Sequence, residues 1–346
     1  MRRVLTALAA AWAASSAWAA GPPSYEIYVT NEISGDLSLI NGSTLQVEAT
    51  VPLGKRPRGV EATADGRQLF VALSGSPIQG PPPAGGVRED AAPADESADG
   101  IGQFDIASRT LVKIIRGVSD PEKLAVTPNG KRIYVASEDT GTAVVLDIAT
   151  GKAIASVKVG EEPEGVRITP DGRTAWVTSE SAQQVSVIDI TTNAVLKQIK
   201  VGKRPRAVAF TPDSTKAYVP GELDGSITVI DAQKLAITDT IQLGANVRPM
   251  DALVSPDGRS LYLSTGRARQ VIHVDTRIDK VLRRATVGAR PWGLAVSPDG
   301  RRIFSANGPS NDVSVIDADS FKVIATIPVR QGPWGIAIAS RPAARR

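Results

Sequence analysis

The chain has 346 residues, of which 42% are apolar, so it is long enough to bury a large core. Its 40 basic and 36 acidic side chains give a net charge of only +4, which provides no general field for nucleic acid or anionic lipid. It has no cysteine and one histidine, which excludes disulfides, cysteine nucleophiles and a multi-copper or conventional zinc centre.

The first 19 residues have the pattern of a cleaved export signal. A basic start at Arg2 and Arg3 precedes an apolar run, and Ala17-Trp18-Ala19 fits a small-residue cleavage site. No later stretch reaches 18 consecutive apolar residues, so no membrane span is predicted. We expect the mature chain, residues 20–346, to form a single domain in the periplasm.

The N-terminal and C-terminal ends of the mature chain complete each other. YEIYVTN, SGDLSLIN and TLQVEATVPL near the N-terminus match the second, third and fourth strands of a repeated unit. The last copy of that unit, PWGIAIAS (residues 333–340), stops after its first strand. Ring closure by the N-terminal strands plus the C-terminal strand would leave no blade face uncovered.

The unit itself repeats about every 42 residues. The copy that follows Pro291 reads GLAV, the turn SPDG, RRIFSAN, the alternating DVSVID and finally FKVIATIPV, which predicts four strands joined by turns. Six whole blades and one shared by both ends predict an all-β, seven-bladed β-propeller with four-stranded blades. A proline marks the start of each copy: Pro57, Pro121, Pro163, Pro205, Pro249, Pro291 and Pro333.

The first full copy carries an insertion. Pro57 and Pro121 are 64 residues apart, whereas later marker prolines are 42 or 44 residues apart. The extra length falls in residues 74–100, which are rich in Pro, Gly, Ala and Asp and are predicted to be a flexible segment between the second and third strands. Two interpretations stay open: a tolerated surface loop, or a lid over a site on that face.

Short motifs add a family resemblance. YVTN occurs literally at residues 28–31, and together with SPDGRRIF and NDVSVID it resembles the bacterial YVTN-repeat seven-bladed propeller family. KRPRG, EEPEG and GPSNDVSVID further resemble the branch associated with pyrroloquinoline-quinone-dependent catabolism. This resemblance implies a periplasmic protein that accompanies quinoprotein alcohol oxidation, with a periplasmic quinoprotein dehydrogenase as a candidate partner.

Residues that recur in the blades are interpreted as architecture. An aromatic residue in the second strand is expected to pack between blades, and an aspartate (once Asn41) that ends the third strand is expected to close a turn. The only histidine, His273, replaces a strand valine and is expected to be structural. The acids that stand four residues after the aromatic are expected to be solvated, with attraction of a cation or a basic partner as the alternative: Glu32, Glu138, Glu180 and Glu222.

One position differs between the copies and should surround the mouth of the central channel. It follows the marker proline and is occupied by Arg58, Glu122, Glu164, Arg206, Met250, Trp292 and Trp334. Two tryptophans on adjacent blades, beside arginines, suit a small anionic or aromatic ligand, or a loop of a partner protein. The alternative is packing at the rim, with exposed Arg–Glu pairs that contribute about 0–1 kcal/mol each.

We therefore expect a monomeric binding or accessory protein without catalysis, cofactor or bound metal. The sequence contains neither a G-x-S-x-G elbow nor a G-x-x-x-x-G-K-[ST] phosphate loop. DIATGKAIAS (residues 147–156) lacks the docking tryptophan of the eight-bladed quinone-binding dehydrogenases. Two alternatives remain: a lactonase-type hydrolase, which the fold would suit, and a nucleic-acid-binding propeller, which the acidic blades and the export signal disfavour.

Overall fold

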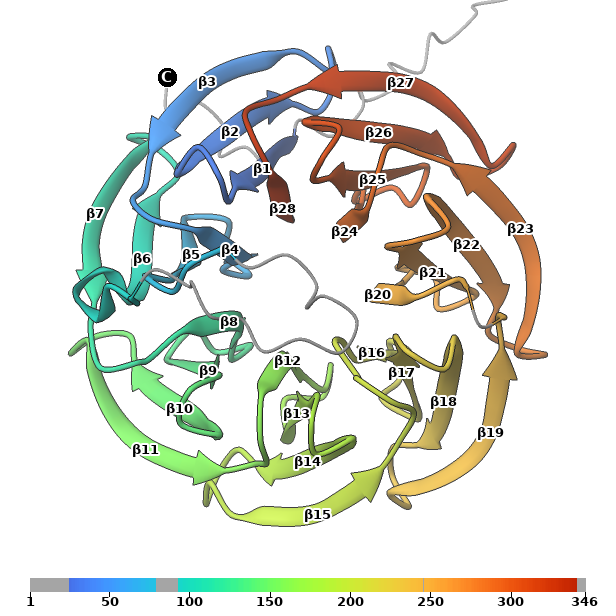
Figure 1. Ribbon diagram of the computed structural model, residues 1–346, viewed down its shortest axis with the longest axis horizontal. Coiled ribbons are helices and arrows are strands. Elements are labelled where there is room, and N and C mark those ends of the chain that lie inside the picture. The colour runs from blue at the N-terminus through green and yellow to red at the C-terminus, as the bar shows by residue number, and fades with distance from the viewer. Residues whose placement is uncertain (1–24, 79–92, 245, 341–346) are drawn as a thin grey trace, which may run out of the picture.

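Seven four-stranded antiparallel sheets are arranged in a ring (Figure 1). The structure is a computed structural model and describes residues 25–78, 93–244 and 246–340. The predicted export signal (residues 1–19) and the centre of the predicted insertion (residues 79–92) lie outside the described residues. Within the described ranges, no helix has the length and apolar character needed to cross a membrane.

The strands of each blade follow one another from the innermost strand outward. Blade 1 contains β28 (Pro333–Ser340), β1 (Tyr25–Asn31), β2 (Asp36–Asn41) and β3 (Val47–Pro52). Blade 2 contains β4 (Pro57–Ala62), β5 (Gln68–Leu73), β6 (Gly100–Asp105), preceded by the short 3-10 helix η1 (Glu96–Ala98), and β7 (Thr110–Ile115). Blade 3 contains β8 (Pro121–Val126), β9 (Arg132–Ser137), β10 (Thr142–Asp147) and β11 (Lys152–Lys158). Blade 4 contains β12 (Pro163–Ile168), β13 (Thr174–Ser179), β14 (Gln184–Asp189) and β15 (Val195–Lys200).

The remaining three blades follow in chain order. Blade 5 contains β16 (Ala209–Phe210), β17 (Lys216–Gly221), β18 (Ser226–Asp231) and β19 (Ala236–Gln242). Blade 6 contains β20 (Pro249–Val254), β21 (Ser260–Thr265), β22 (Gln270–Asp275) and β23 (Lys280–Thr286). Blade 7 contains β24 (Pro291–Val296), β25 (Arg302–Asn307), β26 (Asp312–Asp317) and β27 (Lys322–Pro328). The predicted seven-bladed propeller is confirmed.

Blade 1 closes the ring as the two chain ends predicted. β28 pairs antiparallel with β1, with Ile27 opposite Ile338 and Tyr25 opposite Ser340. In Figure 1 the dark blue and dark red strands lie side by side in this blade. The innermost strand of blade 1 therefore comes from the C-terminal end of the chain, and the other three strands come from the N-terminal end.

The recurring aromatic residues form the packing between blades. Six of the seven are fully buried, and the seventh, Tyr262, is nearly so. The hydroxyl of Tyr134 in blade 3 donates to Asn193 Oδ1 in blade 4, at 2.6 Å. The hydroxyl of Tyr218 in blade 5 donates to Asp279 Oδ1 in blade 6, at 2.7 Å. These observations confirm the predicted packing role, because the rings are buried and the hydroxyls of Tyr134 and Tyr218 also join the next blade.

The aspartates that end the third strand close turns, also as predicted. Asp147 Oδ1 accepts hydrogen bonds from the backbone N–H and the hydroxyl of Thr150, at 2.8 and 2.7 Å. These two hydrogen bonds lower the pKa of Asp147, because they favour its ionised form. Asn41 does the same in blade 1, where its Oδ1 accepts from the N–H of Ser43.

Candidate functional site

The start of each innermost strand has an unusual backbone conformation. The residue before every marker proline has a positive φ, between 39° and 56° for six residues and 70° for a glycine: Arg56, Asp120, Glu162, Arg204, Arg248, Arg290 and Gly332. Positive φ is uncommon outside glycine, so its repetition in every blade shows that the blade geometry imposes it. Together with the residues after the prolines, these residues form one end of the ring, which we call the rim.

The same side-chain contact between neighbouring blades recurs at the rim. The residue before the proline contacts the residue that follows the second strand of the preceding blade. In this way Arg56 pairs with Glu32 at 2.9 Å, Arg204 with Glu180 at 2.5 Å and Arg248 with Glu222 at 3.4 Å. In blade 3, Ser74 donates to Asp120 at 2.5 Å. The expectation that Glu32, Glu180 and Glu222 are simply solvated is therefore wrong, because the ring geometry places a cation against each of them.

Arg206 forms a charge cluster with three glutamates at the rim. Its guanidinium lies 3.1 Å from Glu164, 2.9 Å from Glu180 and 2.6 Å from Glu222. All four side chains are buried. The alternative of exposed Arg–Glu pairs that contribute little to stability is therefore wrong for this cluster. Burial and the charge of Glu164 raise the pKa of Glu180 to about 7. Burial opposes ionisation of Glu222 as well, but Arg206 lowers its pKa below the usual range.

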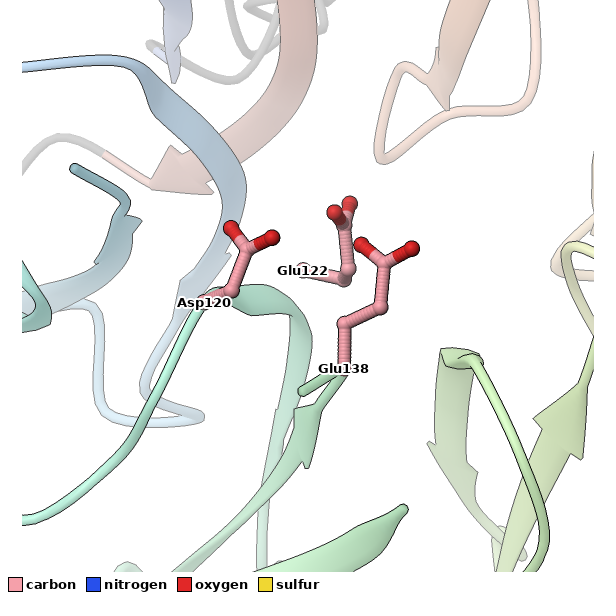
Figure 2. Close-up of side chains that lie close together, drawn as sticks. All are labelled: Asp120, Glu122 and Glu138. Carbon is pink, nitrogen blue, oxygen red and sulfur yellow. The ribbon is translucent and has the colours of Figure 1, made fainter. Parts of the chain in front are cut away.

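Three carboxylates converge at blade 3 (Figure 2). Ligand oxygens of Asp120, Glu122 and Glu138 lie within 4.8 Å of one another. Glu122 is fully buried against Arg58, whose guanidinium also lies 3.8 Å from Asp120. Three carboxylates at this spacing have the hard oxygen ligands that suit Ca²⁺ or Mg²⁺. Arg58 pairs with Asp120 and Glu122, so part of the negative charge that would attract a metal ion is already compensated.

Glu138 differs from the other acids of the cluster. It follows β9 and is partly exposed, and among the described residues its carboxylate has no ion pair or hydrogen-bond partner. The position that holds an arginine beside Glu32, Glu180 and Glu222 is occupied in blade 4 by Glu162, which adds negative charge near Glu138. Burial raises its pKa to about 7, and the charges of Glu164, Asp120 and Glu162 act in the same direction. A carboxylate with this pKa can take up a proton near neutral pH, which is what a general base must do.

Two tryptophans, from blades 7 and 1, stack at the rim. The rings of Trp292 and Trp334 are 5.5 Å apart and inclined by 24°. Arg58 and Lys123 lie over Trp334 at 5.4 and 5.6 Å, and Arg290 lies over Trp292 at 4.8 Å. Trp334 is only 2% exposed, whereas Trp292 is partly exposed. Arg206 also lies over Trp292, at 5.3 Å, so the Trp292 ring is contacted by Trp334 and by two arginines and is only partly accessible.

Most of the predicted site residues meet at one small cavity. Glu164, Arg206, Met250, Trp292 and Trp334 line it together with Lys123, Asp251 and Gly293. Arg58 and Glu122 do not line this cavity, although Arg58 packs on Trp334. That these residues bind a ligand stays a prediction.

Two residues of this cavity were missed from the sequence. The Lys123 ammonium lies 2.8 Å from Asp251 Oδ1, so the pair joins blades 3 and 6. The signal was present in the sequence: other blades have glycine or alanine two positions after the marker proline, as at Gly59 and Gly165. A side chain at Gly59 or Gly165 would meet the backbone of the next blade, at 2.6 and 2.5 Å. Lys123 and Asp251 break this pattern.

The open cavity at blade 3 and the surroundings of His273 are less suited to acid–base catalysis than the rim. A larger, open cavity at blade 3 is lined by small and apolar residues such as Val118, Thr140 and Ala155, with no ionisable side chain. His273 on β22 is bonded to Ser260 at 2.9 Å and to Arg283, and burial lowers its pKa. His273 is therefore held by its neighbours, as expected of a structural residue.

Comparison with known proteins gives a partial family match. Residues 163–322 match the family described as "Lactonase, 7-bladed beta-propeller". No curated protein matches this sequence.

Among solved structures, the chain is similar to the periplasmic gluconolactonase of Pseudomonas aeruginosa (21% identity, TM-score 0.71, 92% of this chain and 100% of that one). It is also similar to a putative 6-phosphogluconolactonase from Bacteroides uniformis (17%, 0.72, 92% and 100%) and to hydrazine synthase of Kuenenia stuttgartiensis (20%, 0.69, 86% and 92%). At these identities the likeness establishes the shared fold.

These comparisons correct the functional expectation. The expectation of a non-catalytic binding or accessory propeller is wrong, because the matched family is a lactonase family and two of the similar structures carry lactonase names. The findings favour what the sequence offered as an alternative, a lactonase-type hydrolase.

Proposed function

We propose that the protein is a lactonase-type hydrolase exported to the periplasm. The observation that carries the proposal is Glu138, a partly exposed rim carboxylate without an ion pair among the described residues, whose pKa lies near 7. The lactonase family match supports the reaction class. The N-terminal signal pattern and the likeness to a periplasmic gluconolactonase support export. The YVTN-repeat resemblance concerns the repeat and remains a prediction.

Hydrolysis of a lactone needs a base that takes a proton from the attacking water and an acid that gives a proton to the leaving ring oxygen. Water adds to the lactone carbonyl carbon, the ring C–O bond breaks, and the product is a hydroxy acid. Glu138 takes the proton from the attacking water and, once protonated, returns it to the ring oxygen as that oxygen leaves. Glu180 has a similar pKa but is held by Arg204 and Arg206, so it is less available as a base.

The negative charge of the transition state needs a cation nearby. Negative charge develops on the carbonyl oxygen when water adds, and fixed cations in a poorly solvated site stabilise it. Lys123 and Arg58, which both lie over Trp334, are the cations on the blade 2 and blade 3 side of the rim. Asp251 holds the Lys123 ammonium in place at 2.8 Å. The partly exposed Trp292 is the aromatic side chain of the rim that the ring of the substrate would contact.

Hydrolysis of a lactone series by the purified full chain tests the proposal. Five- and six-membered lactones, among them glucono-1,5-lactone, are followed by acid release. Glu138→Gln should lower kcat/KM by about 10²–10⁴-fold. Glu161→Gln is the matched control, because Glu161 is an acid near the same rim and the change in charge is equal. Unchanged hydrolysis by Glu138→Gln would remove Glu138 from the mechanism.

A further inference from the structure

The open cavity at blade 3 is large enough for a small molecule. Its volume is about 550 Å³, and small-molecule sites are concave hollows of about 300–1,000 Å³. Its walls come from the two outer strands of blade 3, β10 and β11, and from the segment that links β7 to β8 (Figure 1). It shares no lining residue with the small cavity at the rim, so it is a separate place in the fold.

Blade 3 is hollow here because β11 carries smaller side chains than the outermost strands of the other blades. Ala153 lies opposite Leu146, and the residues at the same register position elsewhere are all larger: Val47, Leu111, Val195, Ile237, Val281 and Val323. Ser156 lies opposite Val144, and its equivalents are larger as well: Thr50, Ile114, Gln198, Thr240, Arg284 and Thr326. In blade 6, Arg284 reaches the Leu243 carbonyl oxygen in the segment from blade 5, at 3.4 Å. Ser156 is too short to span the same distance in blade 3.

The segment before β8 lacks a further side chain. Four residues before the marker proline, five other blades have leucine or valine: Leu53, Val159, Val201, Val287 and Val329. Gly117 occupies this position in blade 3. Val159 is fully buried, whereas a Cβ atom at Gly117 would have no atom of the described residues within 4 Å. Gly117, Ala153 and Ser156 all line the cavity, so three small residues together create it.

The walls of the cavity favour an uncharged ligand. Val118, Val144 and Ile154 offer apolar surface, and none of the described lining residues is ionisable. A charged group in the cavity would lose hydration without gaining a partner of opposite charge. Ser137 Oγ already donates to the Ser119 carbonyl oxygen at 2.6 Å and accepts from the Ser119 N–H at 3.0 Å. The Ser156 hydroxyl has no hydrogen-bond partner among the described residues, so it is available to one polar group of a ligand.

We propose that this cavity binds an uncharged, largely apolar small molecule with one hydrogen-bonding group. The site goes beyond the proposed hydrolase function and does not depend on it. It is nevertheless close to the rim along the chain, since Ser119 precedes Asp120 and Ser137 precedes Glu138. The Glu138 N–H donates to the Asp120 carbonyl oxygen at 3.1 Å. A ligand in the cavity would therefore contact the two segments that carry these rim carboxylates.

A pair of fluorescent probes tests the site and the charge of its ligand. N-phenyl-1-naphthylamine is uncharged, has one N–H donor and fluoresces in apolar surroundings. Its counterpart 8-anilinonaphthalene-1-sulfonate has the same ring system and a negative charge. Titrated into the full chain, the uncharged probe should bind saturably to one site per chain, and more tightly than the sulfonate. No saturable binding of the uncharged probe, whether the cavity is empty or filled by another part of the chain, overturns the proposal, and so does equal or tighter binding of the sulfonate.

Substitutions that copy blade 4 assign the binding to this cavity. Ala153→Val and Ser156→Gln introduce the residues found at the equivalent positions Val195 and Gln198. The double variant should weaken binding of the uncharged probe about tenfold or more, because larger side chains take up the space, and each single variant should weaken it less. Thr326→Gln is the matched control, since Thr326 is the equivalent of Ser156 in blade 7 and lines neither cavity.

Thermal unfolding without probe shows whether each variant is folded, and the single variants serve if the double variant is not. An unchanged Kd in the folded variants, or an equal loss in Thr326→Gln, would place the probe elsewhere and overturn the proposal. Lactone hydrolysis is measured separately, so a failure of the hydrolase function leaves this result intact.

Discussion

Replacing Glu138 by glutamine should lower activity and raise stability at the same time. The glutamine keeps the size of the side chain and removes its charge. In the folded protein the Glu138 carboxylate is costly to ionise, because it is desolvated and lies among Glu164, Asp120 and Glu162. The energetic cost of ionisation is also what raises the pKa of Glu138 to about 7. The glutamine variant therefore avoids this cost but can no longer act as a general base.

The magnitudes follow from a pKa of about 7 against the ordinary 4.5. About half of the Glu138 side chains are ionised at pH 7 and about 1% at pH 5, so kcat/KM should fall about tenfold per pH unit below 7. Between pH 4.5 and 7 the folded protein binds more protons at this group than the unfolded chain does, so stability falls as pH rises. Above pH 7 the full cost is present, about 3 kcal/mol.

Two measurements check this reasoning. The pH profile of kcat/KM for the wild type should show an ascending limb near pH 7. In thermal unfolding, Glu138→Gln should have a higher Tm than the wild type at pH 8 and nearly the same Tm at pH 4. A variant that is less stable than the wild type at pH 8, or a wild-type profile that is flat between pH 5 and 8, would refute the assignment of a raised pKa to Glu138.

Three further changes test the rim and the ring. Arg206→Met leaves three buried carboxylates without their shared cation, so we expect a loss of about 3–5 kcal/mol in calorimetry; an unchanged Tm would contradict the described cluster. In Gly59→Ala the new methyl group would lie 2.6 Å from the Glu122 carbonyl oxygen of the next blade, and the free energy of unfolding in urea should fall by about 1–3 kcal/mol, whereas a neutral effect would show that the blades can separate there. Removing residues 333–346 deletes β28 and exposes β1, so the truncated chain should aggregate in size-exclusion chromatography; a monomeric, cooperatively unfolding product would contradict ring closure as the source of stability.

The fold was predictable because a propeller repeats its local rules in every blade. Turn residues, the buried aromatic and the aspartate that ends the third strand each recur at a fixed spacing, and each has the same role in its own blade. Ring closure followed from the missing strands at the two ends. Tyr25–Asn31 and Pro333–Ser340 pair as their incomplete copies implied.

The site was only partly predictable, because its properties come from contacts between blades. Glu138 and Glu180 occupy equivalent positions in the sequence, yet Arg204 pairs with Glu180, whereas the residue equivalent to Arg204 for Glu138 is Glu162, whose charge raises the pKa of Glu138. The difference lies in the following copy, 24 residues later, and becomes visible only when the contact between blades is known. The position after the proline identified the tryptophans and Arg206 but missed Lys123, which stands one residue further on.

Arg290 shows the same dependence on the neighbouring blade. In the sequence it resembles Arg56, Arg204 and Arg248, which also precede a marker proline. Its different environment depends on a glycine in the preceding blade, since Gly266 replaces the acid that its counterparts contact. A comparison of each residue with its partner position, and not only with its equivalents in other blades, would have identified it.

The hydrolase assignment is tested most simply by the rate at which the full chain opens lactones at pH 7, measured by NMR against the same buffer without protein. We expect at least one five- or six-membered lactone to open faster in proportion to protein concentration, with the hydroxy acid as sole product. If no lactone of the series opens faster than in buffer alone, the hydrolase assignment is wrong.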